Sequence, residues 1–235
     1  PFEKDFYAKF GYDVEFTGNP LLDAIEEYRE ENRMSFEEFT GSAGLQEKPI
    51  IALLPGSRKQ EIKTMLPVMT EVAGKFPDYQ FVISAAPSIS SEFIAENNSN
   101  RLPVFHGKTY SLLEHSSAAL VTSGTATLET ALFRIPEAVC YKSGYLSYQI
   151  AKKLIKVKYI SLVNLIIDRV VVKELIQSEM NVAKLCEELD KMLNDNEYRN
   201  KMLADFDFLI KKLGGRGASR RTALKMAEFI NSIRI

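Results

Sequence analysis

From Pro49 onward, short apolar runs alternate with longer stretches in which apolar residues recur every three or four positions. Short, nearly all-apolar runs are typical of strands covered on both faces, whereas the longer spacing is typical of helices with one buried face. The runs that predict strands are residues 50–54, 80–84, 104–105, 118–122 and 138–141. This alternation predicts an α/β fold in which a Rossmann-like parallel sheet is covered by helices.

The amphipathic stretches predict the helices of this domain. Apolar residues recur with the spacing of one helix face over residues 62–76, 185–193 and 206–213, and a last helix is predicted over residues 218–233. Pro77 ends the first of these helices. Residues 26–38 are charge-dense, which predicts a linker or an exposed helix followed by a loop. The sheet domain is therefore expected to run from about Pro49 to Leu213.

Composition narrows the class of protein. The chain has 235 residues, of which 46% are hydrophobic and 26% charged, as in ordinary globular proteins. Thirty basic and thirty-one acidic residues give a net charge of −1, which argues against a nucleic-acid partner. Cys140 and Cys186 lie far apart, so neither a disulfide framework nor a metal site is predicted. No apolar run reaches the roughly 18 residues that span a bilayer, so we expect no integral membrane segment.

The first candidate binding loop follows the strand at residues 50–54, where ligands of parallel sheets bind. Gly56 permits close backbone approach, and Ser57 is predicted to cap the following helix. Arg58 adds a planar, permanently charged group that suits a phosphate. The alternative is an ordinary strand-to-helix turn with a surface arginine.

The second candidate loop follows the strand at residues 118–122 and opens another helix. Ser123, Gly124, Thr125 and Ala126 place small residues, with hydroxyl groups at the predicted cap, where backbone N–H groups favour an anion. Glu129 lies one turn further and is predicted to accept hydrogen bonds from a ribose, or else is an ordinary acidic residue in a first helical turn. Two such helix starts on one sheet predict a diphosphate site.

Two further features are less specific. The region between Ala138 and Ile167 has five lysines, no acidic residue and several aromatic residues, which is typical either of an amphipathic helix on an anionic membrane surface or of a solvated helix face. Its lysines are Lys142, Lys152, Lys153, Lys156 and Lys158. His106 and Gly107 follow a predicted strand and are expected to line the same cleft, whereas His115, at a helix end, is expected to be structural.

Several of these motifs together carry a family resemblance. Leu-Leu-Pro-Gly-Ser-Arg at 53–58, Ser-Gly-Thr-Ala-Thr-Leu-Glu at 123–129, Ser-Leu-Val-Asn-Leu at 161–165 and Lys-Glu-Leu at 173–175 resemble the C-terminal half of lipid A disaccharide synthases. The opening Pro-Phe-Glu-Lys-Asp-Phe-Tyr and the later Phe-Thr-Gly-Asn-Pro resemble the passage from the N-terminal domain of that family into its linker. The chain begins without an initiator Met, and we therefore expect a C-terminal fragment.

The resemblance implies the C-terminal nucleotide-binding domain of a GT-B fold. Residues 1–23 would end the N-terminal domain, 24–48 would be the interdomain linker, 49–213 the UDP-sugar-binding domain, and 214–235 a helix that crosses back. The implied UDP-binding residues are Gly56, Ser57, Arg58, His106, Gly107, Ser123, Gly124, Thr125, Ala126, Glu129, Asn164 and Glu174. Arg58 and Asn164 match functionally important family residues and are the implied catalytic ones.

The implied activity is that of a bacterial inverting glycosyltransferase of lipopolysaccharide biosynthesis. It transfers 2,3-diacylglucosamine from its UDP donor to 2,3-diacylglucosamine 1-phosphate, forms a β-1,6 linkage and releases UDP, with no metal or redox cofactor. The general base is expected in the N-terminal domain, so we predict no turnover by this fragment. The expected location is cytoplasmic and peripheral on the inner face of the inner membrane, with Lys152, Lys153 and Lys156 at the lipid surface.

Alternatives remain open at this point. One is another UDP-sugar enzyme of the same fold, such as a UDP-N-acetylglucosamine 2-epimerase or the peptidoglycan glycosyltransferase. Another is a non-catalytic module that binds anions or membranes. Separately, the last helix would expose apolar residues if its usual partner were absent, so a homodimer formed by exchange of the C-terminal segment is a further hypothesis.

Overall fold

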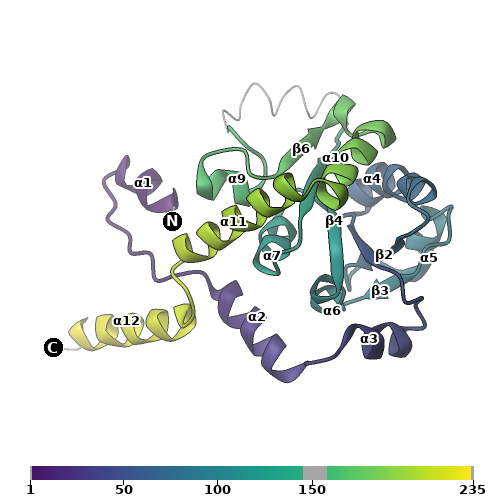
Figure 1. The fold of residues 1–235 in the computed structure, drawn as a ribbon. Coiled ribbons are helices and arrows are strands. Elements are labelled where there is room, and N and C mark those ends of the chain that lie inside the picture. The colour runs from purple at the N-terminus through teal and green to yellow at the C-terminus, as the bar shows by residue number, and fades with distance from the viewer. Residues whose placement is uncertain (1, 145–157, 234–235) are drawn as a thin grey trace.

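The computed structural model of the chain describes residues 2–144 and 158–233, and its core is one six-stranded sheet (Figure 1). The strand order is β3-β2-β1-β4-β5-β6, and every neighbouring pair is parallel. The strands are β1 (Ile50–Leu54), β2 (Gln80–Ala85), β3 (Val104–His106), β4 (Ser116–Thr122), β5 (Glu137–Tyr141) and β6 (Lys173–Ile176). This is the strand order of Rossmann folds, so the predicted fold class is confirmed.

The two central strands are buried over five consecutive residues each. All five residues of β1 are buried, and β4 is buried from Ala118 to its end. Such strands need no polar face because helices cover both sides of the sheet. The five predicted strands match β1 to β5, whereas β6 was missed because Lys173 and Glu174 interrupt its apolar pattern.

Helices form a layer on each face of the sheet. They are α4 (Lys59–Val72), α5 (Ser91–Glu96), α6 (Thr109–Glu114), α7 (Thr125–Leu132), α9 (Leu162–Ile167), α10 (Val182–Asn194) and α11 (Asn196–Lys212), with short 3-10 turns at Ala73–Lys75 and Gln177–Glu179. Helix α10 packs beside α4 and against β4 and β5, while α6 and α7 pack against the other face. The structure thus confirms the predicted helices over residues 62–76, 185–193 and 206–213, and α11 begins ten residues earlier than predicted.

The charge-dense segment before the sheet is largely helical. Helix α1 (Phe2–Ala8) is followed by α2 (Pro20–Glu31) and α3 (Phe36–Ala43). Asn19 caps α2 by accepting a hydrogen bond from the Leu21 N–H, and Pro20 occupies the first helical turn. The α2 residues Leu22 and Ile25 are buried. The helix is therefore amphipathic, with one face packed on the domain rather than exposed all round.

Helix α12 (Ala218–Ile233) extends away from the sheet, beside α2 (Figure 1). The Asp23 carboxylate accepts hydrogen bonds from the Gly217 N–H (2.5 Å) and the Ser219 N–H (2.8 Å), and these bonds lower the pKa of Asp23 to about 2. Beyond this anchor, four large apolar side chains of α12 are more than half exposed: Leu224, Met226, Phe229 and Ile230. The C-terminal helix thus forms as predicted but buries little of its apolar surface.

Two negative findings apply to residues 2–144 and 158–233. No helix there is long and apolar enough to cross a membrane. Nor do three or more His, Cys, Asp or Glu side chains within those ranges gather closely enough to hold a metal ion.

Candidate nucleotide-binding site

A cleft of about 420 Å³ opens at the carboxyl ends of β1 and β4. These strands lie side by side at the centre of the sheet, where the strand order reverses and ligands of such sheets bind. The structure brings together eight residues that the sequence predicted for this site: Gly56, Ser57, Arg58, Ser123, Gly124, Thr125, Ala126 and Glu129. We call this hollow the strand-end cleft, residues 55–58 the β1 loop, and residues 123–124 the β4 loop.

The β1 loop is shaped by a glycine. Gly56 has a φ of +104°, which residues with a side chain rarely adopt. A Cβ atom at this position would lie 2.5 Å from Glu61 Oε2 and 3.3 Å from Thr122 Cγ2. Glycine therefore allows the backbone to turn sharply at the floor of the cleft.

The start of helix α4 differs from the prediction. Arg58 occupies the N-cap position, so Ser57 does not cap the helix as expected. Instead the Glu61 carboxylate, one turn into the helix, accepts from the Arg58 N–H (3.3 Å) and from Arg58 Nη1 (3.0 Å). The Arg58 side chain is 82% exposed, and a surface pair of this kind contributes about 0–1 kcal/mol. Its guanidinium can therefore turn to an anion at little cost.

The β4 loop presents backbone rather than side chains. Gly124 occupies the N-cap position of α7 and no side chain caps that helix, which corrects the prediction of a hydroxyl cap. The Ser123 hydroxyl donates to the Ile160 carbonyl instead (2.8 Å), and the Ser123 N–H donates to the Cys140 carbonyl (3.2 Å). The Thr127 N–H donates to the Gly124 carbonyl (3.2 Å), whereas the Thr125 and Ala126 N–H groups have no hydrogen-bond partner among the described residues. These two groups and the helix dipole favour an anion at the cleft.

Glu129 projects from α7 at the edge of the strand-end cleft. Its Oε1 accepts a hydrogen bond from the Tyr110 hydroxyl (3.1 Å). Burial, followed by the charge of Glu129, raises the pKa of Tyr110 to about 12, so the phenol remains a proton donor at neutral pH. One carboxylate oxygen is thus held in place, which orients the acidic group for a ligand hydroxyl.

A second hollow, of about 790 Å³, adjoins the strand-end cleft and shares Pro87, Thr109 and Glu129 with it. Aromatic side chains distinguish this hollow, which we call the aromatic cavity: Tyr28, Phe39, Phe105 and Tyr110. The sequence reasoning missed it because two of those residues come from α2 and α3, in the segment interpreted as a linker. The regular apolar spacing of Leu22, Ile25 and Tyr28 was the signal that α2 packs on the domain.

The two histidines, His106 and His115, lie in different surroundings. His106 is exposed at the end of β3, its Nε2 lies 3.1 Å from Ser91 Oγ, and it lines neither hollow, contrary to expectation. Gly107 lines the aromatic cavity. His115 stacks on Phe39 with ring centroids 4.3 Å apart, in keeping with its predicted structural role.

Asn164 and Glu174 lie outside the lining of the strand-end cleft. Asn164 is buried on α9, and Glu174 lies on β6, where the two side chains hydrogen-bond to each other (2.9 Å). The structure therefore does not place either as a direct ligand contact. Lys152, Lys153 and Lys156, the predicted membrane contacts, fall outside the described residues, as does most of the predicted basic amphipathic helix.

The parallel sheet and its strand-end cleft define a Rossmann-like domain of the GT-B type. The sequence matches the family described as Lipid-A-disaccharide synthetase over residues 1–228. The chain belongs to that family.

Two relatives support this assignment, and a more distant solved structure shows the same fold. The Lipid-A-disaccharide synthase of Persephonella marina is 35% identical over 237 residues, covering 95% of this chain and 62% of the relative. That of Syntrophus aciditrophicus is 36% identical over 233 residues, covering 95% and 60%. The chain thus spans about 60% of the length of these relatives. The S. aureus MnaA–UDP co-structure has a TM-score of 0.58 at 15% identity, covers 92% of this chain and 54% of that one, and shows the shared fold.

Proposed function

We propose that this chain forms the donor-nucleotide part of a lipid-A-disaccharide synthase. The complete enzyme would transfer 2,3-diacylglucosamine from UDP to 2,3-diacylglucosamine 1-phosphate, forming a β-1,6 linkage in lipid A biosynthesis. The observation that carries the proposal is the strand-end cleft, whose lining includes an exposed arginine, Arg58, and the start of α7 at Gly124, which no side chain of the described residues caps. Family membership favours this activity over the other UDP-sugar enzymes considered above.

The cleft suits the chemistry of a departing nucleoside diphosphate. Negative charge develops on UDP as the sugar leaves, and fixed N–H dipoles together with a guanidinium stabilise that charge. We place the diphosphate between the start of α7 and Arg58, the ribose hydroxyls at Glu129, and the uracil toward the aromatic cavity. The general base would come from the part of the relatives that this chain does not cover.

We further infer that the complete enzyme works at the cytoplasmic face of the inner membrane, because both sugars carry acyl chains. Lys152, Lys153 and Lys156 would contact the anionic lipids of that membrane.

We also infer a homodimer, because exchange of α12 between two copies would bury the exposed Leu224, Met226 and Phe229. Light scattering of the chain at increasing concentration tests the dimer, and a monomer at every concentration would count against it.

Calorimetric titration of UDP tests the proposed function. We expect UDP to bind in preference to ADP, and Arg58→Ala to weaken UDP binding. Arg33→Ala is a matched control, because Arg33 is also exposed but lies away from the cleft. Absence of UDP binding both here and in a full-length relative would overturn the proposal, whereas binding only by the relative would show that the rest of the enzyme completes the site.

A further inference from the structure

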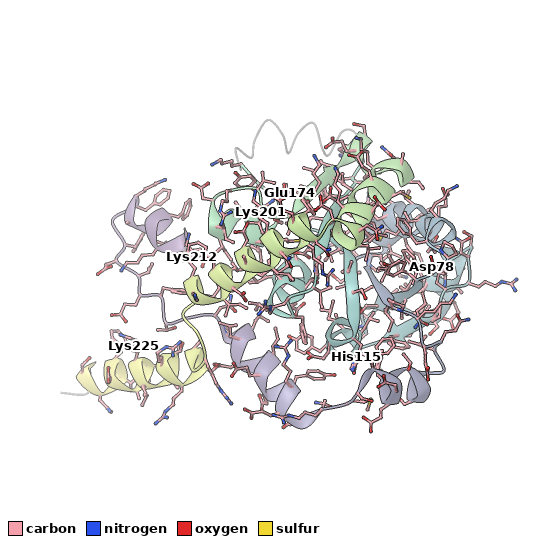
Figure 2. The ribbon with its side chains drawn as sticks, in the orientation of Figure 1. Asp78, His115, Glu174, Lys201, Lys212 and Lys225 are labelled. Atoms are coloured by element: carbon pink, nitrogen blue, oxygen red, sulfur yellow. The ribbon has the colours of Figure 1, made fainter. Side chains whose placement is uncertain are left out.

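A carboxylate on the edge strand binds the backbone of another segment. Both Glu174 oxygens lie 3.1 Å from the Ile160 nitrogen, and Oε1 also accepts from the Ser161 N–H at 3.0 Å. Figure 2 labels Glu174 among the side chains near α9. Charge-assisted bonds to two successive N–H groups fix the orientation of the two peptide units that flank Ile160.

Asn164 holds this carboxylate from the buried side and is only 1% exposed. Its Nδ2 donates to Glu174 Oε1 and to the Val172 carbonyl, each at 2.9 Å. Its Oδ1 accepts from the Val171 N–H (2.8 Å) and the Val172 N–H (3.0 Å). An amide side chain has two donors and two acceptor sites, so no hydrogen-bonding capacity is left for a ligand.

The same segment reaches the strand-end cleft through one hydroxyl. The Ile160 carbonyl, on the residue whose N–H is bound by Glu174, accepts the 2.8 Å hydrogen bond from Ser123 Oγ. Ser123 begins the β4 loop, directly before the uncapped start of α7. A continuous path of hydrogen bonds therefore runs from Asn164 through Glu174 and Ile160 to the β4 loop.

We propose that Glu174 and Asn164 are positioning residues that hold the β4 loop ready for a diphosphate without touching it. This inference rests on the proposed function for the identity of the ligand, but the hold on the loop exists without ligand. A loop fixed before binding loses less conformational freedom when the anion arrives, so affinity depends on residues outside the cleft. Direct contact of either residue with UDP is the competing explanation.

A double-mutant cycle separates the two explanations. Glu174→Gln replaces one of the two acceptor oxygens with an NH₂ donor. Ser123→Ala removes the hydroxyl that donates to the Ile160 carbonyl, which is the last hydrogen bond of the path. We expect each change to weaken UDP binding about tenfold, and the double variant to bind no more weakly than the worse single one, because both cut the same path. Losses that multiply to about a hundredfold would overturn the inference.

Hydrogen exchange without UDP provides a second test. We expect the hydrogen-bonded amides of Ser123, Ile160 and Ser161 to exchange several-fold faster in Glu174→Gln, and in Asn164→Asp, than in the unchanged chain. Glu179→Gln is the matched control, since Glu179 is exposed and lies five residues further along the chain. Unchanged exchange of the Ser123 amide in Glu174→Gln would also overturn the inference. If UDP fails to bind while this exchange accelerates, the proposed function fails but the positioning of the loop stands.

Discussion

The β1 loop and the β4 loop occupy equivalent positions on neighbouring strands but are built in opposite ways. The β1 loop ends in Arg58, whose side chain is 82% exposed and forms an ion pair with Glu61. The β4 loop exposes backbone N–H groups, and Ser123 ties it to Ile160, which Glu174 holds in turn. One loop thus offers a mobile charge and the other a fixed set of dipoles.

This difference divides two tasks of anion binding. Fixed N–H groups need no rearrangement when a diphosphate arrives, whereas an exposed arginine adds charge only after it turns toward the ligand. Substitutions of Asn164 and Glu174, which hold the β4 loop through Ile160, should therefore affect folding as well as binding. Substitutions in the β1 loop that spare Gly56 should affect binding alone.

The largest effect is expected from Asn164→Ala, which should lower the free energy of unfolding by about 4 kcal/mol or more. The change leaves the Val171 and Val172 N–H groups and the Val172 carbonyl without their partner, and each buried unpaired group costs about 1–3 kcal/mol. Urea unfolding followed by circular dichroism measures it. A loss below about 1 kcal/mol would show that the side-chain bonds of Asn164 do not hold this region together.

Glu137, at the start of β5, should make folding sensitive to pH but not alter either loop. Full burial raises its pKa well above the usual 4.5, and neither carboxyl oxygen has a hydrogen-bond partner among the described residues. Above pH 4.5 the unfolded chain releases this proton while the folded chain keeps it. The free energy of unfolding should therefore fall by up to about 1.4 kcal/mol per pH unit until the folded group also ionises.

Replacing this carboxyl tests that expectation. Glu137→Leu should stabilise the chain more at pH 8 than at pH 5, as measured by urea unfolding at both values. UDP affinity should be unchanged at either pH. Equal stabilisation at the two pH values would mean that Glu137 titrates normally in the folded chain.

Arg58→Ala should separate binding from folding most cleanly. We expect UDP affinity to fall about 10- to 100-fold, since hydrogen bonds to charged groups contribute about 1.5–3 kcal/mol. The free energy of unfolding should change by less than about 0.5 kcal/mol, because the Glu61 pair is exposed. The difference from the unchanged chain should shrink as salt is added. A loss of stability comparable to the loss of affinity would erase the distinction between the loops.

The sequence predicted the fold and the location of the cleft better than its internal bonding. Apolar runs identified β1 to β5, and the rule that ligands bind at strand ends placed Arg58 and Gly124 correctly beside the cleft. The roles of Asn164 and Glu174 were not predictable, because their bonds join α9, β6 and a loop that are brought together only by folding. Likewise, no local pattern shows that Gly124 rather than a hydroxyl residue begins α7.

The smallest effect is expected from Tyr110→Phe, which tests whether Glu129 is held as firmly as the β4 loop. The change removes the hydroxyl that donates to Glu129 at 3.1 Å but keeps the ring that packs 5.5 Å from Tyr28. With one fewer bond to orient the carboxylate, UDP should bind about three- to tenfold more weakly, consistent with about 1 kcal/mol for one hydrogen bond. Binding of 2′-deoxy-UDP should fall less, because that ligand lacks one of the two ribose hydroxyls that would donate a hydrogen bond to Glu129. Equal losses for both nucleotides would place the ribose away from Glu129 and leave Tyr110 as part of the packing between α2 and α6.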